Sequence, residues 1–133
     1  MTDPADEKPL MAKPWADIAD FYRWLVEGGM RIGAMVRLVE QIKGSRYARG
    51  LYAWTSKHDL CIAQVPCTFP YDGPYLRISP RFDGTIEFRY IDTPFFEKQW
   101  RRVVKEEDAF ERLERFTDQL RWVVREMKRG AAS

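Results

Sequence analysis

Apolar residues recur with two different periods along this chain, and the periods divide it into helical and extended parts. Residues 15–27 and 30–43 each carry an apolar stripe at helical spacing, and Gly28 and Gly29 separate the two. The pattern therefore predicts two helices, which form either an antiparallel hairpin or one kinked rod. The members of the stripes are Ile18, Tyr22, Leu25 and Val26 in the first, and Ile32, Met35, Val36, Val39 and Ile42 in the second.

Beyond residue 50 the apolar period shortens towards two, which is typical of strands. Residues 51–55 and 60–65 are short apolar segments that flank the polar turn 56–59. If Thr55 pairs with Leu60, both faces of this hairpin are apolar, so we expect the second face to be covered too. The cover is either another element of the chain or a second subunit. The residues predicted to form such an interface are Tyr52, Trp54 and Val65.

A second hairpin follows a proline-rich loop at residues 66–74. A two-residue turn would put its two apolar sets on opposite faces, whereas a three-residue loop at 82–84 pairs Ile78 with Phe88. That loop needs a left-handed residue at its last position, where Gly84 stands. We therefore predict the three-residue loop. The apolar residues that it aligns on one face are Leu76, Ile78, Ile86, Phe88 and Tyr90.

The remaining residues predict one ambiguous segment and one helix. Residues 92–105 fit either a helix or a fifth strand, and the alternation around Trp100 favours the strand. Residues 106–128 carry a helical stripe, with acidic residues at their start and basic residues at their end, as the helix dipole favours. Most tryptophans fall inside predicted elements, where we expect core packing. They are Trp24, Trp54, Trp100 and Trp122.

This order predicts an α+β domain of two layers, with an N-terminal helical segment, a four- or five-stranded antiparallel meander and a long C-terminal helix. The helices are expected to cover the sheet face that carries Ile78 and Phe88. Residues 1–13 are expected to be a flexible tail, residues 14–129 a single domain and residues 130–133 a frayed end.

Composition narrows the class of protein. The chain has 133 residues, of which 45% are hydrophobic and 32% charged, as in globular domains. The net charge of +2 is too balanced for a dedicated nucleic-acid-binding protein. No apolar run approaches the length of about 18 residues that a membrane span needs. Two cysteines make no disulfide framework. We therefore expect a soluble, cytoplasmic protein without membrane association.

The polar face of the second hairpin carries the clearest candidate site. The predicted register sets Arg77 directly opposite Arg89, and like charges at such positions are unfavourable unless something compensates them. One interpretation is an anion- or carboxylate-binding site. The other is a solvated charged face in which Glu87 neutralises both arginines. The predicted ligand-binding residues are Tyr75, Arg77, Glu87 and Arg89.

Catalytic and metal chemistry find little support in the sequence. His58 is the single histidine, and a pair with Cys61 or Cys67 would suit nucleophilic catalysis. However, Cys61 lies in an apolar strand, nothing supplies an oxyanion hole, and the spacing matches no usual zinc site. We predict no catalytic residues, no metal and no cofactor. Basic residues beside aromatic ones hint at single-strand binding. They are Lys43, Arg46, Arg49, Arg101, Arg102 and Lys105.

Three functional hypotheses follow. The leading one is a binding or adaptor module that acts through a sheet surface on a protein partner or on a second copy of itself. The second is a binder or enzyme for a small anionic ligand held by Arg77 and Arg89. The third is weak nucleic-acid binding, which the balanced overall charge disfavours.

Overall fold

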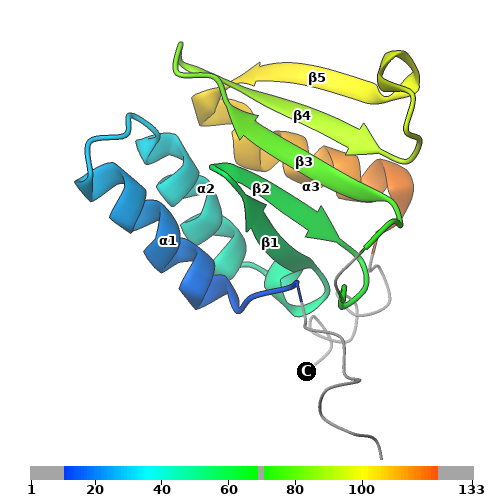
Figure 1. Cartoon of the computed structure of the whole chain (residues 1–133), viewed down its shortest axis with the longest axis horizontal. Coiled ribbons are helices and arrows are strands. Elements are labelled where there is room, and N and C mark those ends of the chain that lie inside the picture. Colours follow the sequence, from blue (N-terminus) through cyan, green and yellow to red (C-terminus); the bar gives the residue numbers. More distant parts are fainter. Residues whose placement is uncertain (1–10, 69–70, 123–133) are drawn as a thin grey trace, which may run out of the picture.

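The predicted order of elements is confirmed in the computed structural model, which describes residues 11–68 and 71–122. Helices α1 (Trp15–Glu27) and α2 (Gly33–Lys43) precede the sheet, with a short 3-10 helix η2 (Arg46–Arg49) between. Helix α3 (Ala109–Leu120) follows the sheet (Figure 1). The strands are β1 (Tyr52–Ser56), β2 (Asp59–Ala63), β3 (Tyr75–Pro80), β4 (Thr85–Ile91) and β5 (Trp100–Lys105).

All five strands pair antiparallel in chain order, β1-β2-β3-β4-β5. The strand interpretation of residues 92–105 is thus confirmed for the part that forms β5, which follows a 3-10 turn, η3 (Phe96–Lys98). Both predicted hairpin registers are also confirmed. Thr55 pairs with Leu60, and Ile78 pairs with Phe88.

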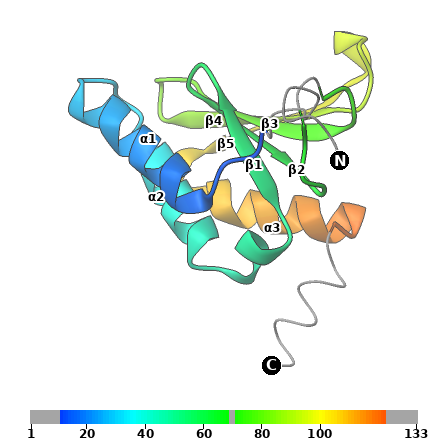
Figure 2. The same ribbon diagram turned by 60° about the horizontal axis from the view of Figure 1, so that its bottom comes forward.

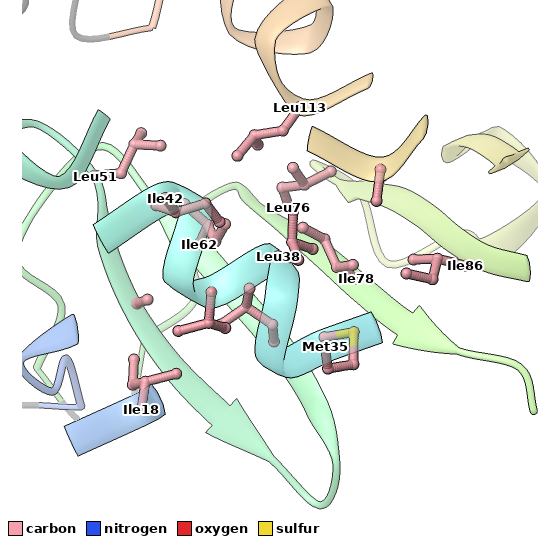
Figure 3. Packing of buried hydrophobic residues seen from close by; sticks show 14 of the residues in the cluster. Ile18, Met35, Leu38, Ile42, Leu51, Ile62, Leu76, Ile78, Ile86 and Leu113 are labelled. Atoms are coloured by element: carbon pink, nitrogen blue, oxygen red, sulfur yellow. The ribbon is translucent and has the colours of Figure 1, made fainter. Parts of the chain in front are cut away.

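The helices lie together on one face of the sheet, which we call the inner face (Figures 1 and 2). Period-two alternation directs the apolar side chains of β2, β3 and β4 to this face, and they are buried. Figure 3 shows Leu38 and Ile42 of α2 against this layer. Sheet residues such as Leu76 and Phe88 are 0% exposed, so the core predicted from the pattern is confirmed.

The two N-terminal helices lie side by side as an antiparallel hairpin, which settles the alternative left open by the sequence (Figure 1). Gly29 takes a φ of 103°, and the N–H groups of Gly29 and Met30 donate to the carbonyls of Val26 and Leu25 at 3.0 and 3.1 Å. This double hydrogen bond is the glycine-ended closure of a helix C-terminus. Because Met30 takes part in this turn, α2 begins at Gly33. The sequence predicted a start at Met30, three residues earlier.

The last helix is shorter than the sequence predicted in the part that the structure describes. It ends at Leu120 because Arg121 takes a left-handed φ of 54° and the N–H of Trp122 donates to the Thr117 carbonyl at 2.9 Å. Trp122 is 2% exposed and packs on Phe116, with ring centroids 5.1 Å apart. Burial of this ring outweighs continuation of the helix. Residues 123–128 of the predicted helix lie outside the described residues.

A second apolar cluster covers the outer face of the β1–β2 hairpin. It consists of Trp54, Cys61, Ala63 and Cys67, with Met11, Tyr71 and Tyr75 packed against it. Trp54 is only 8% exposed, and its ring meets those of Tyr71 and Tyr75 at 5.8 and 5.3 Å. The chain's own loop after β2 therefore supplies the cover that the sequence required.

Part of the predicted tail belongs to this cover. The N–H of Met11 donates to the Cys67 carbonyl at 2.9 Å, and Lys13 forms an antiparallel bridge with Ala53 of β1. This part of the predicted tail is thus hydrogen-bonded, through Lys13 to the edge strand β1 and through Met11 to the loop after β2. Residues 1–10 and 130–133 lie outside the described residues.

One tryptophan departs from the expected core packing. Trp24 of α1 is 68% exposed and borders a hollow of about 660 Å³ at the end of that helix. The neighbouring Val26 is exposed as well, so the apolar stripe of α1 is wider than the face that α2 and the sheet cover.

Substitutions on β1 separate core from surface on the outer face. We expect Trp54→Ala to lower the free energy of unfolding by about 3 kcal/mol or more, because it empties a buried ring site. Tyr52→Ala, two residues away on the same face, removes a side chain that is 36% exposed and should cost about 1 kcal/mol or less. Urea denaturation measures both. Equal losses would contradict the burial of Trp54.

Candidate functional site

Three arginines stand directly opposite one another across the open part of the outer face. Arg77 of β3 pairs with Arg89 of β4, and Arg89 pairs with Arg101 of β5. We call these residues the arginine row. Neighbouring strands lie about 4.8 Å apart, and like charges at directly opposite positions destabilise a sheet. The row therefore depends on the groups that surround it.

Arg77 has a carboxylate partner of its own. Its Nε donates to Oδ2 of Asp59 at 2.7 Å, and its terminal nitrogen lies 3.4 Å from Oγ of Ser56. The side chains of Arg77 and Asp59 are 21% and 15% exposed, so the pair is largely shielded from water. Burial alone lowers the pKa of the Arg77 guanidinium, but the hydrogen bond to Asp59 and the nearby negative charges raise it above its usual value.

Arg89 and Arg101 share one carboxylate. Glu87 lies 3.8 Å from Arg89, 3.5 Å from Arg101 and 3.8 Å from Arg81. Its side chain is 16% exposed and stands between three guanidinium groups. These separations are longer than the 2.7–2.9 Å of charge-assisted hydrogen bonds, so each arginine keeps donors that Glu87 does not engage.

Arg89 is held by a ring as well as by a charge. Its guanidinium lies 5.2 Å from the centroid of the Phe96 ring, a cation–π contact. Its Nε is buried and has no hydrogen-bond partner among the described residues. Four arginines of this face, Arg81 included, thus meet two carboxylates, Asp59 and Glu87. The outer face of β3–β5 carries an excess of positive charge.

The structure brings the predicted ligand-binding residues together but assigns their partners differently. Tyr75 lies beside Arg77 on β3, and the predicted opposition of Arg77 and Arg89 is present. The hypothesis of a solvated charged face required Glu87 to neutralise both arginines. In the structure Glu87 pairs with Arg89 but not with Arg77, whose partner is Asp59. Asp59 and Arg101 were not predicted as part of this site, because they reach it through the β2–β3 and β4–β5 pairings, which alternation within single strands does not predict.

The residues predicted to form an interface do not make one surface. Tyr52 and Val65 are exposed, at 36% and 49%, but Trp54 is buried beneath Tyr71 and Tyr75. A partner at this end of the sheet meets the covering loop rather than the Trp54 ring.

The cysteines are enclosed. Cys61 and Cys67 are each 1% exposed, although Cys67 lies in the loop after β2. Burial raises the pKa of the Cys61 thiol to about 12. Burial also raises the pKa of Cys67, against a hydrogen bond from Tyr71 that lowers it. His58 contacts the Phe82 ring, with centroids 5.5 Å apart. Across residues 11–68 and 71–122 no three His, Cys, Asp or Glu side chains gather as metal ligands.

The basic residues that suggested nucleic-acid binding do not all lie on one side of the sheet. Arg46 lies over the Tyr47 ring near the acidic side chains of α3 on the helical side, and its hydrogen bond with Tyr47 raises its pKa. Arg101 belongs to the outer face and Arg102, next to it on β5, to the inner face. Among the described residues, Arg101 therefore shares no surface with Arg46 and Arg102.

Comparisons of the chain with family models, with curated proteins and with solved structures found no match. In the described ranges, no helix combines the length and the apolar character that crossing a membrane requires.

Thiol reactivity reports on the enclosure of the cysteines. We expect both thiols to react with iodoacetamide at pH 8 at least about tenfold more slowly in native protein than in urea, because the thiolate is the nucleophile and burial disfavours it. Mass spectrometry of Cys61→Ala and Cys67→Ala assigns each rate. Fast labelling of either thiol in the native chain would reopen the cysteine as a reactive site.

The two signs of charge on the outer face should respond unequally to removal. We expect Glu87→Gln to lower the free energy of unfolding by about 1–2 kcal/mol, since it leaves three arginines without their shared carboxylate. Arg101→Gln should change it by no more than about 0.5 kcal/mol, because that arginine is half exposed and in excess. Urea denaturation at low salt provides the comparison. A greater loss for Arg101→Gln would show that the face is not overcharged.

Proposed function

We propose that this protein is a non-enzymatic binding module whose outer sheet face docks an acidic segment of a protein partner. The observation that carries the proposal is the charge imbalance at the arginine row. The three arginines of the row and the neighbouring Arg81 meet only two carboxylates, Asp59 and Glu87. Charge complementarity directs association and selects partners, and arginine is enriched at the energetic centres of interfaces.

Apolar groups beside the row support the same reading. Val103 of β5 shares the outer face with Glu87 and is 38% exposed, and Phe96 under Arg89 is 55% exposed. Aromatic side chains next to arginines are typical of interface centres. The outer edge of β5 also has no strand beside it among the described residues. An extended acidic segment can therefore add main-chain hydrogen bonds to its salt bridges.

A second copy of the chain is a less favourable partner for this surface than an acidic segment. A symmetric dimer through this face would set one arginine row against another, and an isologous contact repeats every such repulsion twice.

Free Cys61 and Cys67 fit a reducing compartment, which supports the expectation of a cytoplasmic protein.

A labelled acidic peptide tests the proposal. The probe is a fluorescent ten-residue Glu/Ser peptide, read by anisotropy at low salt. We expect Arg81→Gln/Arg101→Gln to weaken binding at least about tenfold, since each substitution removes a charge-assisted contact. The matched control is Arg31→Gln/Arg49→Gln, which removes the same charge from exposed arginines elsewhere and should leave the affinity within about twofold.

Equal losses of peptide affinity in the two double variants would mean that only the net charge of the protein matters. That result would overturn the proposed docking site. Tighter binding of glutarate than of the peptide would replace it with a small-anion site on the same arginines. Tighter binding of single-stranded DNA would favour the nucleic-acid hypothesis instead. Native mass spectrometry of the unliganded protein checks for dimers.

A further inference from the structure

A second concentration of arginine lies on the opposite side of the sheet from the arginine row. Strand β5, helix α3 and Asp108 just before the helix line an open hollow of about 290 Å³ there. Its size is at the lower end of the range for small-molecule sites. The lining residues are Arg102, Val104, Asp108, Glu111, Arg112 and Arg115.

Arg112 is the unusual residue of this hollow. It is only 7% exposed, yet its Nε has no hydrogen-bond partner among the described residues. One terminal nitrogen donates to Oε1 of Gln119 at 3.2 Å, and the guanidinium lies 5.5 Å from the centroid of the Trp100 ring. Neither contact supplies negative charge. A buried cation is normally paired with a carboxylate, because removing it from water is costly.

The neighbouring charges increase this imbalance. Burial, and then the positive charges of Arg102 and Arg115, lower the pKa of the Arg112 guanidinium below its usual value. Arg102 forms no ion pair with any described residue. Arg115 is already engaged by Glu111, with 2.6 Å between nitrogen and oxygen.

Two carboxylates also line the hollow, and they limit what it can hold. Glu111 is neutralised by Arg115, and Asp108 makes no ion pair with Arg102 or Arg112. Three arginines against two carboxylates leave a small positive excess at the wall. That excess is concentrated on Arg102 and Arg112, whose guanidinium groups have free donors for oxygen acceptors.

We propose that this hollow binds a phosphate group, with Arg112 as the buried donor and Arg102 as the donor at the mouth. Guanidinium groups match the oxygens of phosphate in geometry as well as in charge. The site is distinct from the arginine row, since β5 directs Arg101 to the outer face and Arg102 to the inner one. Free inorganic phosphate and the phosphate of a small organic ester share this chemistry.

Titration of the full chain with inorganic phosphate, followed by thermal shift and calorimetry, tests the proposal. We expect saturable binding that Arg112→Gln abolishes and Arg102→Gln weakens at least about tenfold. Arg102 is exposed, so its variant keeps the test valid if Arg112→Gln fails to fold. The matched control is Arg31→Gln, which should bind phosphate as the unmodified chain does.

Tighter binding of glycerol 3-phosphate than of inorganic phosphate identifies an organic ester as the ligand, and the reverse identifies the free ion. Three results would each overturn the proposal: no saturable phosphate binding, chloride that competes for the site as well as phosphate does, or an unchanged phosphate affinity in Arg102→Gln. The variant Arg81→Gln/Arg101→Gln separates this site from the docking face, because it should leave phosphate affinity unchanged while it weakens the acidic peptide.

Discussion

The pairing of β3 with β4 is the constraint on which both the core and the candidate site depend. Gly84, with a φ of 88°, closes the loop so that Ile78 meets Phe88 and Arg77 meets Arg89. A shift of one residue would turn every side chain of one strand to the other face. Burial of the apolar row on the inner face therefore holds the arginines in opposition. Hydrophobic contacts on the other side of the same strands offset the electrostatic repulsion among these arginines.

The outer face is divided into two unlike halves. Over β1 and β2 the chain closes the sheet with its own aromatic loop, so Trp54 and both cysteines are removed from solvent. Over β3, β4 and β5 no such cover exists among the described residues, and charged side chains take its place. Strand β5 belongs to both proposed sites because its alternation sends Arg101 and Arg102 to opposite layers.

Local pattern was sufficient for the elements, the registers of both hairpins and the face that the helices cover. It failed where distant segments decide. Asp59 meets Arg77 only because β2 and β3 pair across a long loop, which alternation within one strand does not reveal. The helix end at Arg121 depends on the burial of Trp122. Arg112 counts as a polar position in any stripe, so its burial was invisible in the sequence.

The sequential strand order has a consequence for synthesis and folding. Each strand pairs with the one made just before it, so most contacts are local and the sheet can grow along its free edge as the chain emerges. Helix α3 is the exception, because it is made after the whole sheet and supplies Leu113 and Phe116 to the core. Until residues 109–122 leave the ribosome, part of the inner face of β3–β5 stays uncovered. An interrupted chain that stops before Ala109 therefore exposes apolar surface that favours aggregation and capture by chaperones.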